Sequence, residues 1–245
     1  MPIIEHLKPP AAPPVSTRPK AYRGAFFLGL GTFVLLVVIG GARASVMRRL
    51  PSLYDAADVY TRATELEEAG DLAGAARELR AATFIQPQEI TGYERLGYLQ
   101  GASGDAAGEL ATYERAYLHN PLSPRANMIL GLAYLRRERF EAASERLRLA
   151  VRLDPNDAML QAALGDLLVA QGQHGEAIST FARALDLDPD ESALHNKAAI
   201  AFAYAGQTDR ARQHFERAVQ LDPRNEEAAG NLRQVLTMMQ EGRKP

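Results

Sequence analysis

The amino-acid sequence predicts an all-α protein in which one membrane-spanning helix precedes five helix-turn-helix repeats and a C-terminal capping helix. Three observations predict this fold. Residues 24–42 form an apolar run without a charge. From residue 56 onward, apolar residues recur at helical spacing. Finally, five prolines recur every 34 residues, at Pro87, Pro121, Pro155, Pro189 and Pro223.

Composition narrows the function classes. Of the 245 residues, 47% are hydrophobic and 24% are charged, which is ordinary for a folded protein. The absence of cysteine excludes disulfides, thiolate zinc sites and a cysteine nucleophile. Residues 1–50 contain seven basic side chains and one acidic side chain, whereas residues 51–245 contain 21 basic and 29 acidic side chains. This acidic main part argues against nucleic-acid binding, which requires a basic surface to neutralise phosphates.

Residues 1–23 are basic and rich in proline. Six prolines fall within the first twenty residues, and they prevent a helix and a buried core. We therefore expect a disordered tail.

Residues 24–42 are predicted to form a transmembrane helix. A helix of this length spans roughly 28 Å, close to the ~30 Å hydrocarbon core of a bilayer. Arg23 and Arg43 bracket the run, and residues 43–55 follow as a linker. Two alternatives remain open, namely a buried helix of a soluble domain and a signal peptide cleaved after Ala44. The run is longer than the ~7–15 apolar residues of a signal peptide, which favours an uncleaved anchor.

The proline spacing defines the repeat units. Placing each proline at position 32 gives units 56–89, 90–123, 124–157, 158–191 and 192–225. Position 8 is then always Gly or Ala, position 24 is always large and apolar or aromatic, and position 27 is always Ala. Position 20 is Ala in every unit except the second, which has Glu109. The small residues allow the two helices of a unit to approach closely, and the large residue fills the space beside them.

Turn and end signals complete the pattern. Position 15 is Gly in four units, as expected where a first helix ends, and Glu138 in the third unit predicts a less tightly specified turn. Residues 226–240 are amphipathic and are predicted to cap the last repeat, which would otherwise expose an apolar face. Residues 241–245 form a short tail.

This pattern resembles the tetratricopeptide repeat family over residues 56–225. Tyr93, Leu96 and Gly97 in the second unit match the first-helix signature of that family, as do Leu130, Gly131 and Tyr134 in the third. The sequence departs from the family at Gln100, where an aromatic residue is usual. It also departs where tryptophan is frequent, at Asn127, Gln161 and His195. The resemblance implies a right-handed α-solenoid whose first helices line a concave groove.

The sequence holds no pattern of catalytic residues. The five histidines form no His-Glu-x-x-His pair, and no glycine-rich phosphate loop is present. We therefore expect no enzymatic activity, metal site, cofactor or small-molecule substrate.

The resemblance implies which residues bind a partner. In the family, positions 2, 5, 9, 12 and 13 of each unit face the groove. The Lys/Asn clamp that some members use for a C-terminal carboxylate is not reproduced. The corresponding protein-binding candidates are Tyr60, Glu94, Tyr98, Arg125, Met128, Leu132, Arg136, Met159, Asp166, Asn196, Ile200 and Tyr204.

These features predict a membrane-anchored scaffold or adaptor that binds a peptide or an amphipathic helix in its groove. Two alternatives are a chaperone-like assembly factor for envelope, secreted or cytochrome proteins and a non-catalytic subunit of a membrane enzyme complex. The basic residues on the two sides of the span nearly balance, and they favour a cytoplasmic tail only slightly. The expected location is a bacterial inner membrane, with the repeats on the periplasmic side.

Overall fold

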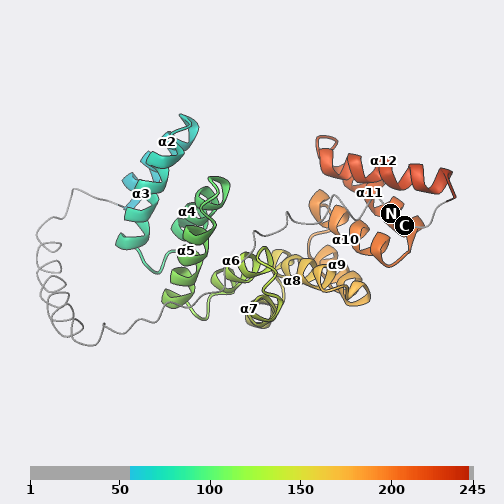
Figure 1. The fold of residues 1–245 in the computed structure, drawn as a ribbon, viewed down its shortest axis with the longest axis horizontal. Helices are drawn as coiled ribbons and strands as arrows, with labels where there is room; N and C mark the ends of the chain where they lie inside the picture. The colour runs from blue at the N-terminus through green and yellow to red at the C-terminus, as the bar shows by residue number, and fades with distance from the viewer. Residues whose placement is uncertain (1–55, 243–245) are drawn as a thin grey trace, which may run out of the picture. The chain divides into compact units, whose positions relative to one another are not determined.

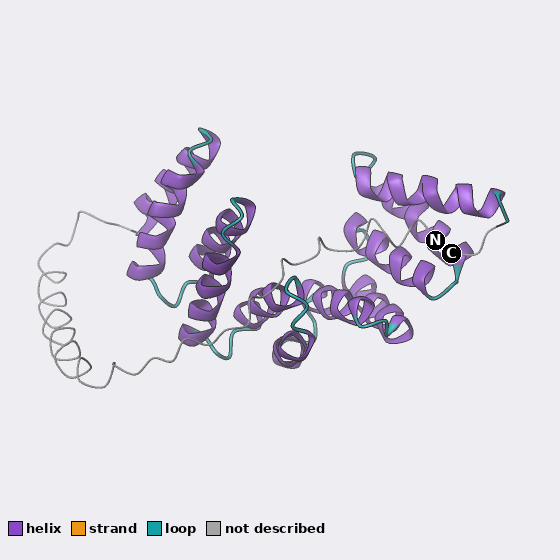
Figure 2. Ribbon diagram, in the orientation of Figure 1, coloured by secondary structure: helices purple, strands orange, loops and turns teal. Residues whose placement is uncertain are grey.

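The computed structural model describes residues 56–242, which form eleven α-helices, and no strand occurs within this range (Figures 1 and 2). The helices are α2 (Ala56–Glu68), α3 (Leu72–Ile85), α4 (Ile90–Ala102), α5 (Ala106–His119), α6 (Pro124–Leu135), α7 (Phe140–Leu153), α8 (Ala158–Ala170), α9 (His174–Leu187), α10 (Ser192–Tyr204), α11 (Thr208–Leu221) and α12 (Glu226–Gln240).

The predicted tail, transmembrane helix and linker, residues 1–55, lie outside the described residues. None of the helices between residues 56 and 242 combines the length and the apolar character that crossing a membrane requires.

The described chain divides into two compact units at Glu78 and Leu79. The first of them contains α2 and the start of α3. There, the Arg62 Nε donates a hydrogen bond of 3.1 Å to the Glu78 Oε2 and so links the two helices. The second unit contains the end of α3 and all helices from α4 to α12.

In the second unit, the helices stack in chain order (Figure 1). Each first helix, from α4 to α10, packs against the second helix that follows it, and each second helix packs against the next first helix. Successive first helices also contact each other, whereas successive second helices between α5 and α11 have no comparable contact. The first helices therefore line the inner side of this stack.

In the second, third and fourth units, the close approach of paired helices depends on glycine at position 8. A Cβ atom built on Gly131 would lie 2.7 Å from the Leu147 Cγ, and one on Gly165 would lie 2.6 Å from the Phe181 Cε1. Both distances are shorter than any normal carbon–carbon contact. In the second, third and fourth units, the residue at position 24 thus occupies the space that the missing side chain at position 8 leaves.

This packing predicts opposite effects for two glycine substitutions in neighbouring helices. Gly165→Ala forces a methyl group against the Phe181 ring, and overpacking of this kind costs about 1–3 kcal/mol. Because alanine favours a helix over glycine by ~1 kcal/mol, we expect a net loss of about 1 kcal/mol from the free energy of unfolding. In the control Gly175→Ala, the added Cβ meets nothing within 4 Å, so a small gain is expected. Urea unfolding of both variants tests this, and equal effects would contradict it.

The turn of the third unit is as regular as the others, which corrects the expectation for Glu138. Glu138 adopts a φ of 54°, in the left-handed region that Gly104 and Gly172 occupy in the second and fourth units. The Arg139 N–H donates to the Tyr134 carbonyl at 3.0 Å, as the Gln173 N–H does to the Leu168 carbonyl at 2.8 Å. The unit keeps this turn despite the steric cost of a side chain at positive φ.

The departures from the family pattern at position 4 share one role. In three successive units, the side chain at this position donates a hydrogen bond to the carbonyl of the proline at position 32 of the preceding unit. The pairs are Asn127 Nδ2 with Pro121 O at 2.9 Å, Gln161 Nε2 with Pro155 O at 3.0 Å, and His195 Nε2 with Pro189 O at 3.0 Å. A polar donor at position 4 therefore fastens each of these units to the one before it.

Candidate functional site

Eleven of the twelve predicted partner-binding residues lie on α4, α6, α8 and α10 or directly after them, on the helices that line the inner side of the stack. The twelfth, Tyr60, lies on α2 in the other compact unit. Tyr98 and Met159 are strongly exposed, with 71% and 57% of their surface accessible. Met128 and Asn196 are instead buried, and Leu132, Ile200 and Tyr204 are half-buried. We call the surface formed by these four helices the first-helix face.

Some of the predicted residues pair with each other across neighbouring units. The Arg125 guanidinium donates two hydrogen bonds to the Glu94 carboxylate, from Nε at 2.7 Å and from Nη2 at 3.1 Å. The Asn196 amide donates to the Glu227 carboxylate at 3.0 Å. As in the first pair, a residue at position 5 of one unit bonds to the residue at position 2 of the segment that follows. Met128 and Met159 occupy these positions at the middle of the stack. At positions 5 and 2, the face is therefore polar at its two ends and apolar between them.

A cavity of about 510 Å³ lies among α4, α5 and α6. Its lining includes the buried Glu109 carboxylate, which accepts hydrogen bonds from the Nη2 atoms of Arg136 and Arg137, the latter at 3.0 Å. Arg137 is also held by the backbone carbonyls of Ala133 and Ala106. We call this cavity the arginine pocket; its lining residues are Tyr98, Gly101, Ala102, Ala106, Glu109, Tyr113, Arg136 and Arg137.

The Tyr113 hydroxyl adds a hydrogen-bond donor to the arginine pocket. Burial raises the pKa of Tyr113 to about 12, and the Glu109 charge contributes to the rise. The hydroxyl is therefore protonated at neutral pH. No group within residues 56–242 forms a hydrogen bond with it. The donor is thus free for a ligand in the pocket.

Two of the predicted groove residues, Tyr98 and Arg136, line this pocket, whereas Glu109, Tyr113 and Arg137 were not among the predicted residues. One signal was present, because Glu109 is the residue that breaks the alanine pattern at position 20. A carboxylate at a buried position needs cationic partners, and the two arginines follow at the end of the next first helix.

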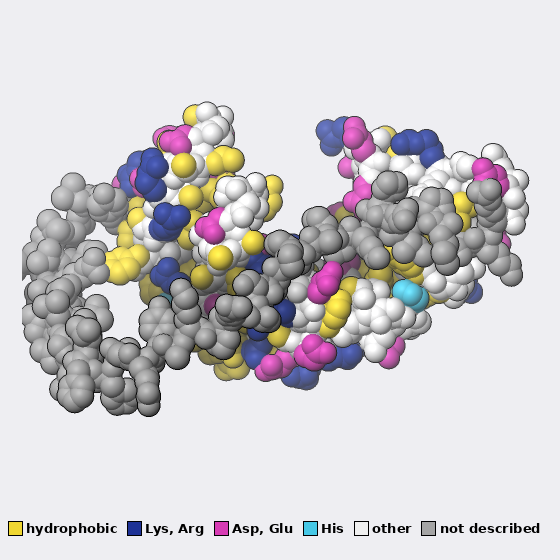
Figure 3. Space-filling model, in the orientation of Figure 1, with side chains coloured by type: hydrophobic (Ala, Val, Ile, Leu, Met, Phe, Trp, Pro, Cys, Tyr) yellow, Lys and Arg dark blue, Asp and Glu magenta, His cyan; other side chains and the backbone are white. Residues whose placement is uncertain are grey.

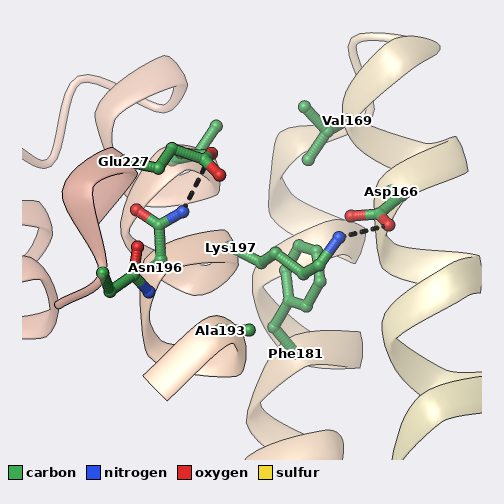
Figure 4. A pocket seen from close by; sticks show the side chains of 9 residues that line it. Asp166, Val169, Phe181, Ala193, Asn196, Lys197 and Glu227 are labelled. Carbon is green, nitrogen blue, oxygen red and sulfur yellow. Dashed lines mark hydrogen bonds and ion pairs between the residues drawn. The ribbon is translucent and has the colours of Figure 1, made fainter. Parts of the chain in front are cut away.

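A second cavity, of about 190 Å³, is formed by residues of α8, α9, α10 and α12 together with Asn225 (Figure 4). In it, the Lys197 ammonium donates to the Asp166 Oδ2 at 2.6 Å, while Asn196 points toward Glu227 (Figure 4). Burial raises the pKa of Asp166, Lys197 opposes the rise, and Glu227 adds to it. We call this cavity the acidic pocket; its lining residues are Asp166, Val169, Phe181, Ala193, Asn196, Lys197, Ile200, Asn225 and Glu227.

The acidic pocket brings together three predicted residues, Asp166, Asn196 and Ile200. Lys197 and Glu227 were missed, because neither belongs to the set of predicted groove residues. On the side shown in Figure 3, basic, acidic and hydrophobic side chains are interspersed over the described helices.

The comparison with known families decides what this architecture is. The model of the tetratricopeptide repeat matches residues 94–158 and 160–236, more than half of the chain. The chain belongs to the tetratricopeptide repeat family. Its described part is thus a tetratricopeptide solenoid. No curated protein matches the chain.

Solved structures of other tetratricopeptide repeat proteins share the fold. TTC0263 from Thermus thermophilus matches with a TM-score of 0.64 at 21% identity, over 75% of this chain and 100% of that one. YrrB, described as having an unusual peptide-binding site, gives 0.52 at 21% identity, over 75% and 95%. MamA from Desulfovibrio magneticus RS-1 gives 0.55 at 20% identity, over 71% and 99%. At this identity, the likeness shows the fold alone.

Two histidines of this tetratricopeptide repeat protein share a hydrogen bond. The Nδ1 atoms of His195 and His214 lie 3.1 Å apart. Because the His195 Nε2 donates to the Pro189 carbonyl, the His195 Nδ1 is the acceptor when the ring is neutral. The His214 Nδ1 is then the donor. Protonating both rings places two N–H groups against each other.

Within residues 56–242, no group of three or more His, Cys, Asp and Glu side chains is arranged to hold a metal ion.

The pair predicts a pH dependence of stability. Burial lowers the pKa of His214 below its ordinary value of 6.5, and His195 lowers it further. The unfolded chain therefore binds a proton more readily, so stability is full above about pH 6.5 and falls as the pH drops below it. We expect the free energy of unfolding to decrease from pH 7 to pH 5, by no more than about 1.4 kcal/mol per pH unit for this proton. His214→Gln should flatten the curve, and parallel curves for both proteins would contradict the prediction.

Proposed function

We propose that this chain is a membrane-anchored, non-catalytic scaffold that binds a partner polypeptide on its first-helix face. The carrying observation is the strong exposure of two large apolar side chains, Tyr98 and Met159, on helices that line the inner side of the stack. Large exposed apolar side chains can mark interaction sites, and these two belong to the same series of first helices. Family membership supports the same role, as does the peptide-binding site described for YrrB.

The test removes these two side chains and compares matched controls. Tyr98→Ala/Met159→Ala shortens the apolar residues of the first-helix face. Leu118→Ala/Leu122→Ala shortens two residues that are at least as exposed, at 72% and 73%, but lie on α5 and the loop after it. Tagged full-length chains are crosslinked in cells, purified, and compared by quantitative mass spectrometry. We expect the partner to be depleted about tenfold with the first variant and retained with the control.

Equal recovery with both variants would overturn the proposed binding face. The same experiment separates the forms that this function can take. One partner at constant ratio indicates an adaptor or a subunit of a complex, whereas many partners at low occupancy indicate a chaperone-like factor.

The anchoring part of the proposal rests on residues 24–42 and on the basic residues that bracket them. We propose a single span in a bacterial inner membrane, with the repeats on the periplasmic side. A C-terminal tag on the full chain tests this by its protease sensitivity after the outer barrier is opened. Digestion from outside supports the proposal, and protection until lysis reverses the orientation. A product shortened by about 44 residues would replace the anchor with a cleaved signal peptide.

A further inference from the structure

Two cavities lie toward opposite ends of the first-helix face, and their charges differ in sign. The arginine pocket has two guanidinium groups for one carboxylate, Glu109. The acidic pocket has two carboxylates, Asp166 and Glu227, for one ammonium group, Lys197. Each pocket therefore holds one charge more than its internal pairs neutralise.

The charged groups that remain are accessible to a ligand. The side chain of Arg136 is 52% exposed, and only its Nη2 is engaged with Glu109. Beside it, the Tyr113 hydroxyl is a free donor at the wall of the pocket. At the other end, Glu227 is exposed on α12 and accepts one hydrogen bond, from Asn196. A carboxylate has several lone pairs, so Glu227 retains capacity for a cationic donor.

The face between the pockets is apolar. Met128 lies at position 5 and Met159 at position 2 of the next unit, where the preceding pair of units has Glu94 and Arg125. Methionine side chains adapt their shape and are frequent on surfaces that accept apolar segments. A bound molecule therefore meets donors at one end, the exposed Met159 in the middle and carboxylates at the other end.

We propose that the first-helix face binds a polypeptide segment in one direction, with an acidic side chain in the arginine pocket and a basic side chain in the acidic pocket. The inference rests on the proposed function, because it assigns a chemistry and an orientation to the bound partner. A segment with an apolar middle and opposite charges at its ends complements all three zones. A nucleic acid does not, because its phosphates are repelled by the acidic pocket.

The experiment selects ligands without assuming a partner. A random library of 16-residue peptides is panned against the full 245-residue chain in detergent micelles, and the enriched peptides are resynthesised. Each is also made with Glu and Asp changed to Gln and Asn, and separately with Lys and Arg changed to Gln. Fluorescence anisotropy then measures the affinity of the parent and of both neutralised forms. We expect each neutralised form to bind about fivefold more weakly.

Variants of the chain locate each charge. Arg136→Gln should abolish the preference for acidic over neutralised peptides, whereas Arg136→Lys should retain most of it. Glu227→Gln should abolish the preference for basic peptides and leave the acidic preference intact. The matched controls are Arg183→Gln and Glu176→Gln, which change exposed residues of α9 and should change neither preference. Thermal unfolding followed by circular dichroism verifies that each variant is folded.

The outcomes separate this inference from the proposed function. If peptides bind but neutralisation leaves their affinity unchanged, the charge-directed orientation is wrong and the scaffold function stands. The same holds if Arg183→Gln lowers the acidic preference as much as Arg136→Gln does. If no peptide is enriched, both the orientation and peptide capture by this face are overturned.

Discussion

Leu147→Ala should remove about 3 kcal/mol from the free energy of unfolding. Leu147 is fully buried at position 24 of the third unit, directly against Gly131. Truncating a buried leucine loses its transfer free energy and leaves a cavity, at a cost of ~2–5 kcal/mol.

Leu118→Ala is the matched control. Leu118 lies on α5, also a second helix, but it is exposed, so the same truncation should change stability by less than about 0.5 kcal/mol. Urea unfolding monitored by circular dichroism measures both variants. A loss at Leu147 no larger than that at Leu118 would show that position 24 does not carry the packing between paired helices.

Glu109→Ala should cost about 2 kcal/mol, although it restores the alanine that the other four units have at position 20. Without the carboxylate, the guanidinium groups of Arg136 and Arg137 lose their shared partner. Orphaning a buried charge costs ~3–5 kcal/mol, but Arg136 is half-exposed and regains water, so the expected loss is smaller. The free-energy cost of the unpaired guanidinium groups therefore exceeds any stability gained from alanine at position 20.

A second variant isolates the cause. Glu109→Ala/Arg137→Met removes the less exposed arginine as well and should recover at least half of the loss, because an apolar replacement of a whole ion pair is close to neutral. Chemical denaturation of the single and double variants, with exposed Glu176→Ala as a control, measures this. A stabilised Glu109→Ala variant would show that the repeat pattern, not the charge cluster, decides stability at this position.

The helices were predictable from the sequence because each unit repeats a local pattern. Position 8 holds Gly or Ala and position 24 holds a bulky side chain, and the structure packs Gly165 against Phe181 as that pattern requires. The turn at Glu138 was not predicted correctly. The sequence predicted a less tightly specified turn, because the glycine of the other units is missing there. In the structure, Glu138 instead adopts the positive φ that glycine adopts in the other turns.

The candidate site was less accessible from the sequence. Groove positions were assigned one unit at a time, but the side chains meet across units. Arg125 bonds to Glu94, and Lys197 bonds to Asp166, in both cases across a separation of 31 positions in the sequence. Such pairs depend on how successive units are offset in space, which the pattern within one unit does not specify. Arg125 and Glu94 thus stabilise the stack in addition to any contact with a partner.

Because each unit between α4 and α12 makes its extensive contacts with its immediate neighbours, these contacts also determine where the stack unfolds first. Between α4 and α12, no helix has extensive contacts with another that is more than two positions away in chain order. Asn225, Glu227 and Asn231 tie α12 to the fifth unit alone. Local unfolding therefore starts where a unit has one neighbour and moves inward. Amide hydrogens of α6 to α9 should consequently exchange with deuterium most slowly, and the residues of α12 should exchange earlier.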